Sequence, residues 1–311
     1  RAALGGPVSD ATNAGGRQYA SAVHSQDARR ATSSRRHPSG LPSCRRLPVP
    51  ADWLLVLVLF VNAVEGADGA GFGTAGQRCT SLGNLIIHED IYDEFVERFM
   101  EKVKSTVIGD SMRHDGVLYG SMLSEKYAVD FLKGIEMCEA SGATKIWGEG
   151  RITNDNKPEK FHGDASEGVY MWPHVYVDVT EGMECFHEEI FGPVVTIVKA
   201  RDFDHALHLA NASPYGLSSA IYTNDRLEAY RYKTGIKAGM TGINNSTTGA
   251  EAHLPFGGVK GSGNGTRESG IWVIEAYSYW HAVNDELSGK LQLAQMDVDE
   301  IEMEEAWLLN H

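Results

Sequence analysis

From residue 62 onward, short apolar segments alternate with amphipathic ones, and this alternation constrains the fold more than any other feature of the chain. Between residues 92 and 107, Phe95, Phe99 and Val103 recur at helical spacing with charged residues between them, as expected of a helix with one apolar face. The same patterns predict further helices over 63–72, 126–141, 203–212 and 226–235, and strands over 84–88, 175–179, 194–199 and 217–223. Strands that alternate with helices predict an α/β fold with a mainly parallel sheet covered on its faces.

The first 61 residues differ from the rest in charge and composition. They hold eight Arg, no Lys and three Asp, a net charge of +5, whereas the whole chain carries −14 and the remainder therefore −19. Residues 1–52 are rich in Ser, Ala, Gly and Pro and lack periodicity, which predicts no regular structure. An Arg-rich, acid-poor start is typical of organelle transit segments, but the absence of Lys and of an initial Met favours a truncated or foreign start.

The longest apolar run and the net charge argue against two classes of partner. Residues 53–61 are apolar over nine positions, whereas a membrane-spanning helix needs about 20, so we expect no membrane span. The run would suit one buried strand. A net charge of −14 lacks the positive surface that nucleic-acid binding requires. We therefore expect a cytoplasmic protein, with an organelle transit segment over 1–52 as the minor alternative.

Cys79 is the strongest candidate for a reactive side chain. The small residues at 73–76 permit a tight turn and leave space beside the sulfur. Arg78 places a positive charge next to the thiol, and such a partly open, electropositive setting favours a thiolate. Cys138 and Cys185 lack a comparable loop, so we expect the first in a helix core and the second in ordinary packing.

Two other patterns are weaker. Gly71 to Gly76 spell a literal GxGxxG, but only seven residues separate it from the strand expected at 84. A dinucleotide-binding turn needs a helix after the motif, and none fits in that interval. His205 and His208 lie three positions apart on an expected helix, but no third ligand is spaced to complete a metal site. We therefore expect neither a nucleotide turn nor a metal.

Four segments, in order along the chain, resemble motifs of the NAD(P)-dependent aldehyde dehydrogenases. They are Phe72–Thr80 around the cysteine, Glu188–Pro193, Asn211–Ala220, and Pro255–Gly263 with Arg267–Gly270. A weaker likeness at 249–251 is to the branch that acts on α-aminoadipic semialdehyde and related semialdehydes. The resemblance implies the catalytic domain of that fold over 62–270, an oligomerisation arm over 271–290 and an acidic tail over 291–311.

The resemblance also implies a mechanism and a cofactor. The Cys79 thiolate would attack the aldehyde carbon, and the Cys79 N–H would donate to the resulting oxyanion. Hydride transfer to NAD or NADP would leave a thioester that water hydrolyses. Glu189 would accept hydrogen bonds from ribose hydroxyls, and Phe191 would pack beside the nicotinamide. Without its motif, Glu189 would equally suit a solvated surface.

The remaining residues implied by the resemblance would bind substrate. Phe256 would line the aldehyde tunnel, although an ordinary core position is an even alternative. Arg78 and the backbone at Gly249 and Ala250 would hold a distal carboxylate of the aldehyde, a task that suits the forked donors of a guanidinium.

The chain also departs from the family pattern. The family supplies a Glu-Leu-Gly-Gly motif, with the general base, a few dozen residues before the cysteine, and residues 1–61 contain no Glu. The upstream Asn of the oxyanion hole and most of the dinucleotide-binding domain have no counterpart either. We expect an aldehyde-oxidising enzyme that is weakly active as this chain. The alternative is a non-catalytic remnant that only folds or assembles with related subunits.

Residues 271–284 are dense in aromatic and β-branched side chains, which favours a strand. One alternative is a last strand of the chain's own sheet. The resemblance implies instead an arm that adds to a partner subunit's sheet, where pairing would protect an apolar edge from aggregation. We therefore expect a homodimer or homotetramer that depends on this arm.

Overall fold

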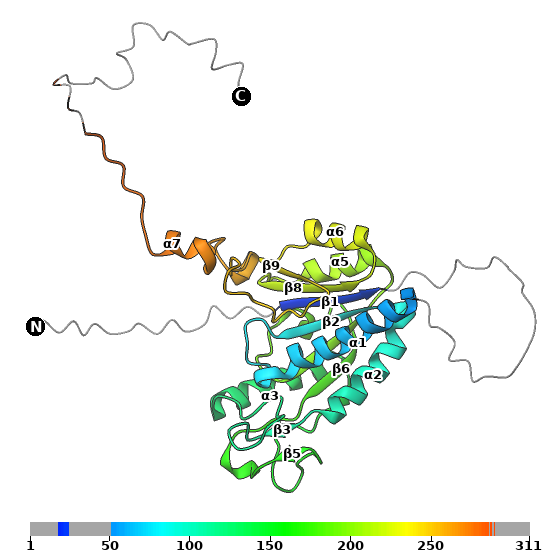
Figure 1. The fold of residues 1–311 in the computed structure, drawn as a ribbon. Coiled ribbons are helices and arrows are strands. Elements are labelled where there is room, and N and C mark those ends of the chain that lie inside the picture. The colour runs from blue at the N-terminus through cyan, green and yellow to red at the C-terminus, as the bar shows by residue number, and fades with distance from the viewer. Residues whose placement is uncertain (1–17, 25–50, 286, 288, 290–311) are drawn as a thin grey trace, which may run out of the picture. The chain divides into compact units, whose positions relative to one another are not determined.

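The computed structural model describes residues 18–24, 51–285, 287 and 289, and the chain divides into two units, residues 1–276 and 277–311. The first unit contains a seven-stranded sheet (Figure 1). In spatial order its strands are β4 (Thr144–Trp147), β6 (His174–Val179), β7 (Val194–Ala200), β2 (Leu82–His88), β1 (Gln18–His24), β8 (Ser218–Thr223) and β9 (Met240–Ile243). Its neighbouring strands are parallel except for β4 and β6, which are antiparallel. The predicted α/β fold with a mainly parallel sheet is therefore confirmed.

The helices of the same unit are α1 (Ala51–Phe72), α2 (Tyr92–Ser105), α3 (Glu125–Ala140), α4 (Glu184–His187), α5 (Phe203–Ala212), α6 (Arg226–Gly235) and α7 (Val273–Ala276). Five of them correspond to predicted helices, and α4 and α7 were not predicted. Two further short strands, β3 (Ile108–Gly109) and β5 (Phe161–His162), pair with each other in parallel. The helices predicted over 203–212 and 226–235 are confirmed with the same ends.

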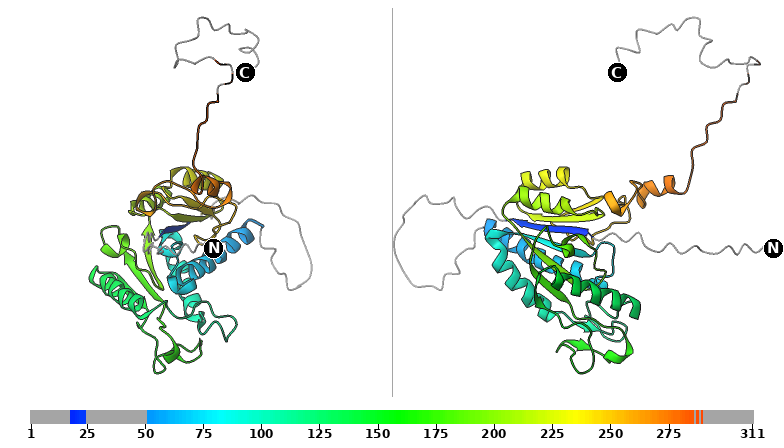
Figure 2. Two further views of the ribbon diagram at one scale, coloured as in Figure 1. Left: turned by 90° about the vertical axis from the view of Figure 1, so that its left-hand side faces the viewer. Right: turned by 180° about the vertical axis from the view of Figure 1, so that it is seen from behind.

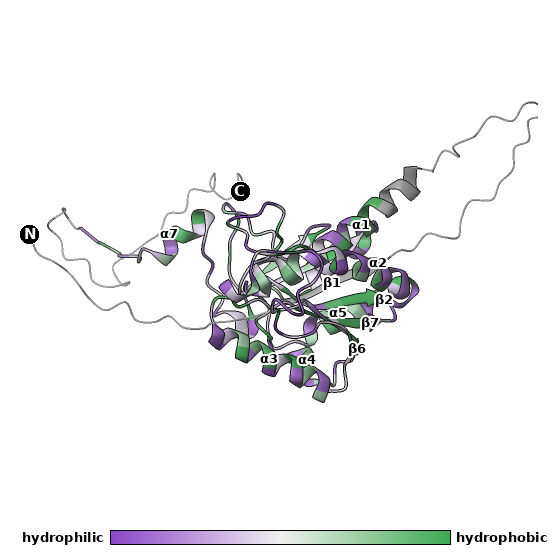
Figure 3. Ribbon diagram, turned by 90° about the horizontal axis from the view of Figure 1, so that it is seen from below, coloured by the Kyte–Doolittle hydropathy of each residue, from purple (hydrophilic) through white to green (hydrophobic). Residues whose placement is uncertain are grey.

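Helices cover both faces of the sheet (Figure 2). Leu85, Ile86 and Ile87 are consecutive in β2 and fully buried, which requires apolar cover on each face because neighbouring side chains of a strand point to opposite sides. Helix α1 packs on β1, β2, β7 and β8, and α5 packs on β1, β2 and β7. Hydrophobic residues accordingly follow the central strands (Figure 3).

Two expectations for the N-terminal region were wrong. Residues 18–24 form β1, which pairs in parallel with both β2 and β8, although no regular structure was predicted over 1–52. Residues 53–61 belong to α1 and do not form a buried strand. The nine apolar residues continue into the periodic segment at 63–72, so one helix includes both. The rest of residues 1–50 lies outside the described residues.

Residues 271–284 do not form the predicted strand. A single turn at Gly270–Trp272 leads into α7, and residues 277–285 have no regular structure. In the second unit Tyr277 and Tyr279 are each 88% exposed and Trp280 is 93% exposed. Among the described residues these side chains belong to no strand, which contradicts the reading as a last core strand. The acidic tail expected over 291–311 lies outside the described residues.

No helix in the described part of the chain is long and apolar enough to cross a membrane.

Asp68 of α1 gives a first prediction. Its side chain is 2% exposed, and the Thr106 hydroxyl donates a hydrogen bond of 2.9 Å to it. Burial raises the pKa of Asp68 from 3.8 to about 6. The folded protein therefore binds this proton more tightly than the unfolded chain, so stability falls as the pH rises from about 4 to about 6, by about 3 kcal/mol from this group.

We expect Asp68→Asn to remove this loss, because the amide oxygen still accepts from Thr106 but carries no charge. The measurement is the urea unfolding free energy of both proteins at intervals between about pH 4 and 7. The unfolding free energy of the variant should increase relative to that of the wild type as the pH rises. If the unfolding free energies of the two proteins stayed a constant distance apart at all pH values, Asp68 would not cause the loss, since the two proteins share every other titrating group.

Candidate active site

The loop before Cys79 is held tightly against a second segment of the chain. Thr74, Ala75 and Gly76 all have left-handed backbone angles, with φ of 57°, 55° and 65°. A Cβ on Gly76 would lie 2.0 Å from the carbonyl oxygen of Gly192, so only glycine allows this approach. No helix intervenes between this turn and β2, as expected, and the nucleotide-turn reading of the GxGxxG is excluded.

The segment that contacts this loop runs from α4 to β7 and carries the two predicted cofactor residues. A Cβ on Gly192 would lie 2.1 Å from the Phe131 ring, and one on Gly134 would lie 2.5 Å from Ile190. The two glycines therefore let α3 pack directly against residues 190–192. The cysteine loop and α3 therefore both pack closely against residues 188–193.

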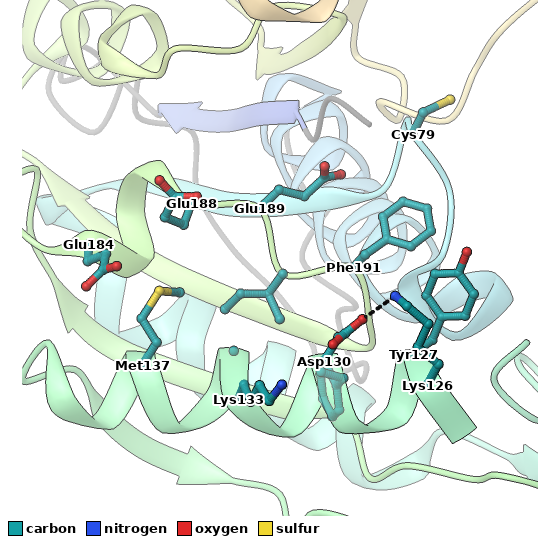
Figure 4. Close-up of a pocket in the computed structure, with 13 residues that line it drawn as sticks. Cys79, Lys126, Tyr127, Asp130, Lys133, Met137, Glu184, Glu188, Glu189 and Phe191 are labelled. Atoms are coloured by element: carbon teal, nitrogen blue, oxygen red, sulfur yellow. Dashed lines mark hydrogen bonds and ion pairs between the residues drawn. The ribbon is translucent and has the colours of Figure 1, made fainter. Parts of the chain in front are cut away.

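These three elements enclose a cleft of about 780 Å³ (Figure 4). Cys79, Glu189 and Phe191 line it, so the structure brings together the predicted nucleophile and both predicted cofactor residues. In Figure 4 the Cys79 sulfur points away from Glu189 and Phe191, so Cys79 stands at the boundary of the cleft.

Helix α3 supplies the opposite wall with polar residues that sequence reasoning did not single out. These are Lys126, Tyr127, Asp130 and Lys133. The Lys126 ammonium pairs with the Asp130 carboxylate at 2.8 Å. The available signal was the polar face of the amphipathic helix, since positions 126, 130 and 133 recur at helical spacing. That face is indistinguishable in sequence from one that contacts only solvent.

The electrostatic setting of Cys79 differs from the prediction. The pKa of the half-buried thiol is raised, first by burial and also by the negative charge of Glu189. The backbone N–H groups of Cys79 and Thr80 donate toward the sulfur and lower the pKa, but not enough to reverse the shift. The positive charge of Arg78 does not contribute, because its side chain is exposed. The expectation that the setting favours the thiolate was therefore wrong for the chain alone.

A second prediction follows from the charge on Glu189. We expect Glu189→Gln to lower the pKa of Cys79 and to speed its alkylation by iodoacetamide a few-fold near neutral pH, because more thiol is ionised. Peptide mapping after brief alkylation measures the rate, and Glu188→Gln, an exposed neighbour, is the matched control. An unchanged rate for Glu189→Gln, or an equal gain for Glu188→Gln, would contradict the electrostatic coupling.

A second, smaller cavity of about 340 Å³ collects three of the predicted substrate residues. Gly249, Ala250 and Phe256 line it, together with Glu251. Arg78 is not in this lining. The structure therefore brings together the loop and the aromatic residue of the predicted substrate site and leaves the guanidinium outside it.

This cavity adjoins the cysteine loop through a buried hydrogen bond. The Thr247 hydroxyl donates to the Thr80 carbonyl at 2.9 Å, and the Ser218 hydroxyl donates to the Thr247 carbonyl at 2.6 Å. Thr247 and Ser218 both line the cavity. Cys79 thus lines the hollow with Glu189 and Phe191, and its neighbour Thr80 is bonded to the lining of the hollow with Gly249, Ala250 and Phe256.

The other residues considered as metal ligands or reactive thiols make structural contacts. His208 hydrogen-bonds with the exposed Glu181 carboxylate. Among the residues that the structure describes, no group of three or more His, Cys, Asp or Glu side chains could hold a metal ion. Cys138 is buried in α3, as predicted, and Cys185 is buried in α4.

Comparison with known proteins identifies the family. Residues 60–283 match the aldehyde dehydrogenase family. The chain is 39% identical to α-ketoglutarate semialdehyde dehydrogenase from Haloferax volcanii, over 72% of this chain and 45% of that protein. It is 38% identical to vanillin dehydrogenase from Corynebacterium glutamicum, over 70% of this chain and 41% of that protein.

Solved structures give the same result. The NAD-dependent aldehyde dehydrogenase from Sinorhizobium meliloti superposes with a TM-score of 0.67 at 30% identity, over 75% of this chain and 44% of that one. Betaine aldehyde dehydrogenase from Staphylococcus aureus, solved with NAD⁺, superposes with a TM-score of 0.65 at 30% identity, over 70% and 41%. The chain spans less than half the length of these relatives. It belongs to the aldehyde dehydrogenase family.

Proposed function

We propose that this chain is the catalytic part of an NAD(P)-dependent aldehyde dehydrogenase, which oxidises an aldehyde to a carboxylic acid. One observation carries the proposal. Cys79 lines a cleft with Glu189 and Phe191, and its neighbour Thr80 is hydrogen-bonded to the lining of a cavity that contains Gly249, Ala250 and Phe256. A nucleophile in this position can receive a cofactor from the cleft and an aldehyde from the cavity.

The cleft suits the nicotinamide half of the cofactor. Its volume of about 780 Å³ is in the range of small-molecule sites. The Glu189 carboxylate supplies acceptors for ribose hydroxyls, and the half-buried Phe191 ring offers an apolar face to a flat heterocycle. The ammonium groups of Lys126 and Lys133 on the facing wall suit a cofactor that carries phosphates. NAD or NADP would supply the hydride acceptor when bound.

The protein's own residues would perform the covalent steps. The Cys79 thiolate forms a bond to the aldehyde carbon, and the carbonyl oxygen becomes an oxyanion. The backbone N–H groups that donate toward the sulfur are suitably placed to stabilise negative charge beside it. After oxidation, Cys79 holds the acyl group as a thioester, and water releases the acid. Because the pKa of Cys79 is raised, deprotonation of the thiol must accompany attack or precede it.

The substrate class rests on the relatives. Several of them are semialdehyde dehydrogenases, including the α-ketoglutarate semialdehyde enzyme and a succinate-semialdehyde dehydrogenase from Deinococcus radiodurans. We propose that the cavity lined by Gly249 and Ala250 receives the far end of a semialdehyde. The exposed Arg78 would have to swing toward the cavity to pair with a distal carboxylate.

The test is cofactor reduction by the purified chain with a panel of aldehydes: a semialdehyde, an aromatic aldehyde and a quaternary ammonium aldehyde. Mass spectrometry of the quenched reaction would locate the acyl group. The proposal expects an acyl adduct on Cys79, formed only with cofactor present. If neither cofactor reduction nor any adduct occurs with a chain that is folded by circular dichroism, the alternative of a non-catalytic assembly remnant gains support.

We also propose that the chain assembles as a homodimer or homotetramer through residues 271–284. Tyr277, Tyr279 and Trp280 are almost fully exposed in the single chain, and such side chains are commonly covered in an interface. As a third prediction, truncation before Ile271 should convert the assembly to monomer in light scattering. A matched full-length variant with Tyr277, Tyr279 and Trp280 all changed to Ser should do the same. An unchanged oligomer in both would place the interface elsewhere.

A further inference from the structure

Cys138 and Cys185 form a buried pair that the proposed reaction does not use. They are 47 positions apart in the chain, and their side chains are 0% and 3% exposed. Helices α3 and α4 pack against each other, and the Cys138 thiol hydrogen-bonds with the sulfur of Cys185. The two sulfurs are thus neighbours that only the folded chain brings together.

The surroundings make the two sulfurs unequal. Hydrogen bonds from the Cys138 thiol and from the Ser141 hydroxyl lower the pKa of Cys185 against the opposing effect of burial. A hydrogen bond that stabilises the thiolate makes Cys185 the stronger nucleophile of the pair. Cys138 donates this bond, so it is held in place beside its partner.

Each cysteine follows a residue that lines the cleft. Met137 precedes Cys138 and Glu184 precedes Cys185, and both Met137 and Glu184 line the cleft. In Figure 4 these two residues lie at the same end of the cleft, one on each wall. A covalent bond between the two cysteines would therefore link α3 to α4, the helices that carry these two lining residues.

We propose that Cys138 and Cys185 are a peroxide-sensitive dithiol that hydrogen peroxide converts to an intramolecular disulfide. The Cys185 thiolate attacks one peroxide oxygen, the O–O bond breaks, and hydroxide leaves, which gives a sulfenic acid on Cys185. The Cys138 sulfur then attacks the Cys185 sulfur, the S–O bond breaks, and a second hydroxide leaves. The two thiol protons convert both hydroxides to water, so two thiols and one peroxide give one disulfide and two waters.

Ordinary packing would also place two small apolar side chains side by side, and it predicts a different outcome. Packed thiols without a reactive partner stay reduced because buried cysteines are inert. In a reactive dithiol, by contrast, the second thiol reacts with the sulfenic acid of the first before that sulfur is oxidised further. This inference does not depend on the proposed dehydrogenase activity.

The test uses the whole chain with Cys79→Ser, which removes the half-buried thiol as a competitor. The protein is treated with hydrogen peroxide, unfolded in N-ethylmaleimide and mapped without reduction. We expect a linked peptide pair containing Cys138 and Cys185, with the mass of two hydrogens lost and with reversal by dithiothreitol. Closing this loop should also raise the Tm by roughly 5–10 °C.

Two single variants in the same background test the order of the steps. With Cys138→Ala, dimedone present during oxidation should label Cys185; with Cys185→Ala, Cys138 should be recovered as its N-ethylmaleimide adduct. If a variant does not fold, the linked peptide in the parent protein decides alone. Recovery of both thiols as N-ethylmaleimide adducts from the parent would overturn the proposal, as would links to Cys44 at equal yield.

Discussion

Replacement of Cys79 by serine is expected to abolish acyl transfer by this chain, with a loss of at least about 10³-fold. Removal of a catalytic nucleophile typically has an effect of this size or larger. The serine hydroxyl is far less acidic than the thiol, so almost no alkoxide is present near neutral pH. The loss should be complete because no other cysteine of the described chain lines the cleft.

The measurement needs no cofactor. A nitrophenyl ester acylates a nucleophilic thiol directly, and release of nitrophenolate reports the acylation rate. Cys138→Ala is the matched control, since it removes a buried thiol of α3 and should retain the Cys79-dependent release. If Cys79→Ser released nitrophenolate as fast as the parent, another residue would be the nucleophile and the proposed function would lose its central group.

The fold was predictable where local patterns and tertiary structure agree. The periodicity at residues 203–212 and 226–235 gave helices with the observed ends, because an Asp precedes each one and its carboxylate accepts from the first-turn backbone. Strands β6, β7 and β8 were found within one residue at each end, because each contains β-branched or aromatic residues typical of strands.

Other elements had no local signal. The four residues of β9 have a sheet neighbour on one side only, at the edge beside β8. β1 lies in a region whose Ser-rich and Arg-rich composition predicts disorder, and its pairing partners are more than fifty residues away. At 271–284 strand propensity predicted the wrong element. Propensity describes side chains that pack on a neighbour, and this segment pairs with no strand among the residues that the structure describes.

The site was predictable as a set of residues but not as an electrostatic environment. Sequence order and motif resemblance indicated Cys79, Glu189 and Phe191, and the structure brings them to one cleft. The neighbouring position of Arg78 suggested a positive field at the sulfur. The Arg78 side chain is exposed, however, so burial and the charge of Glu189 raise the pKa of Cys79. Adjacency in sequence does not fix where a long side chain places its charge.

The last prediction concerns release of the acyl group. The chain has no Glu-Leu-Gly-Gly motif, and general-base assistance is typically worth about 10²–10⁴-fold. Four carboxylates line the cleft with Cys79. Asp130 pairs with Lys126, Glu189 is proposed to bind ribose, and the other two are Glu184 and Glu188. We therefore expect a rapid burst of up to one nitrophenolate per Cys79, followed by a steady rate at least about 100-fold slower.

Hydroxylamine separates a missing base from other causes of slow turnover. It is a strong nucleophile at neutral pH without help from a carboxylate, so it should cleave the thioester and raise the steady rate toward the burst rate. Glycerol at equal concentration is the control, since its hydroxyls also need a base. A linear time course with no burst, unaffected by hydroxylamine, would mean that acylation limits turnover. Rapid hydrolysis without hydroxylamine would mean that a carboxylate of this chain acts as the base, and Glu189→Gln would then identify whether it is Glu189.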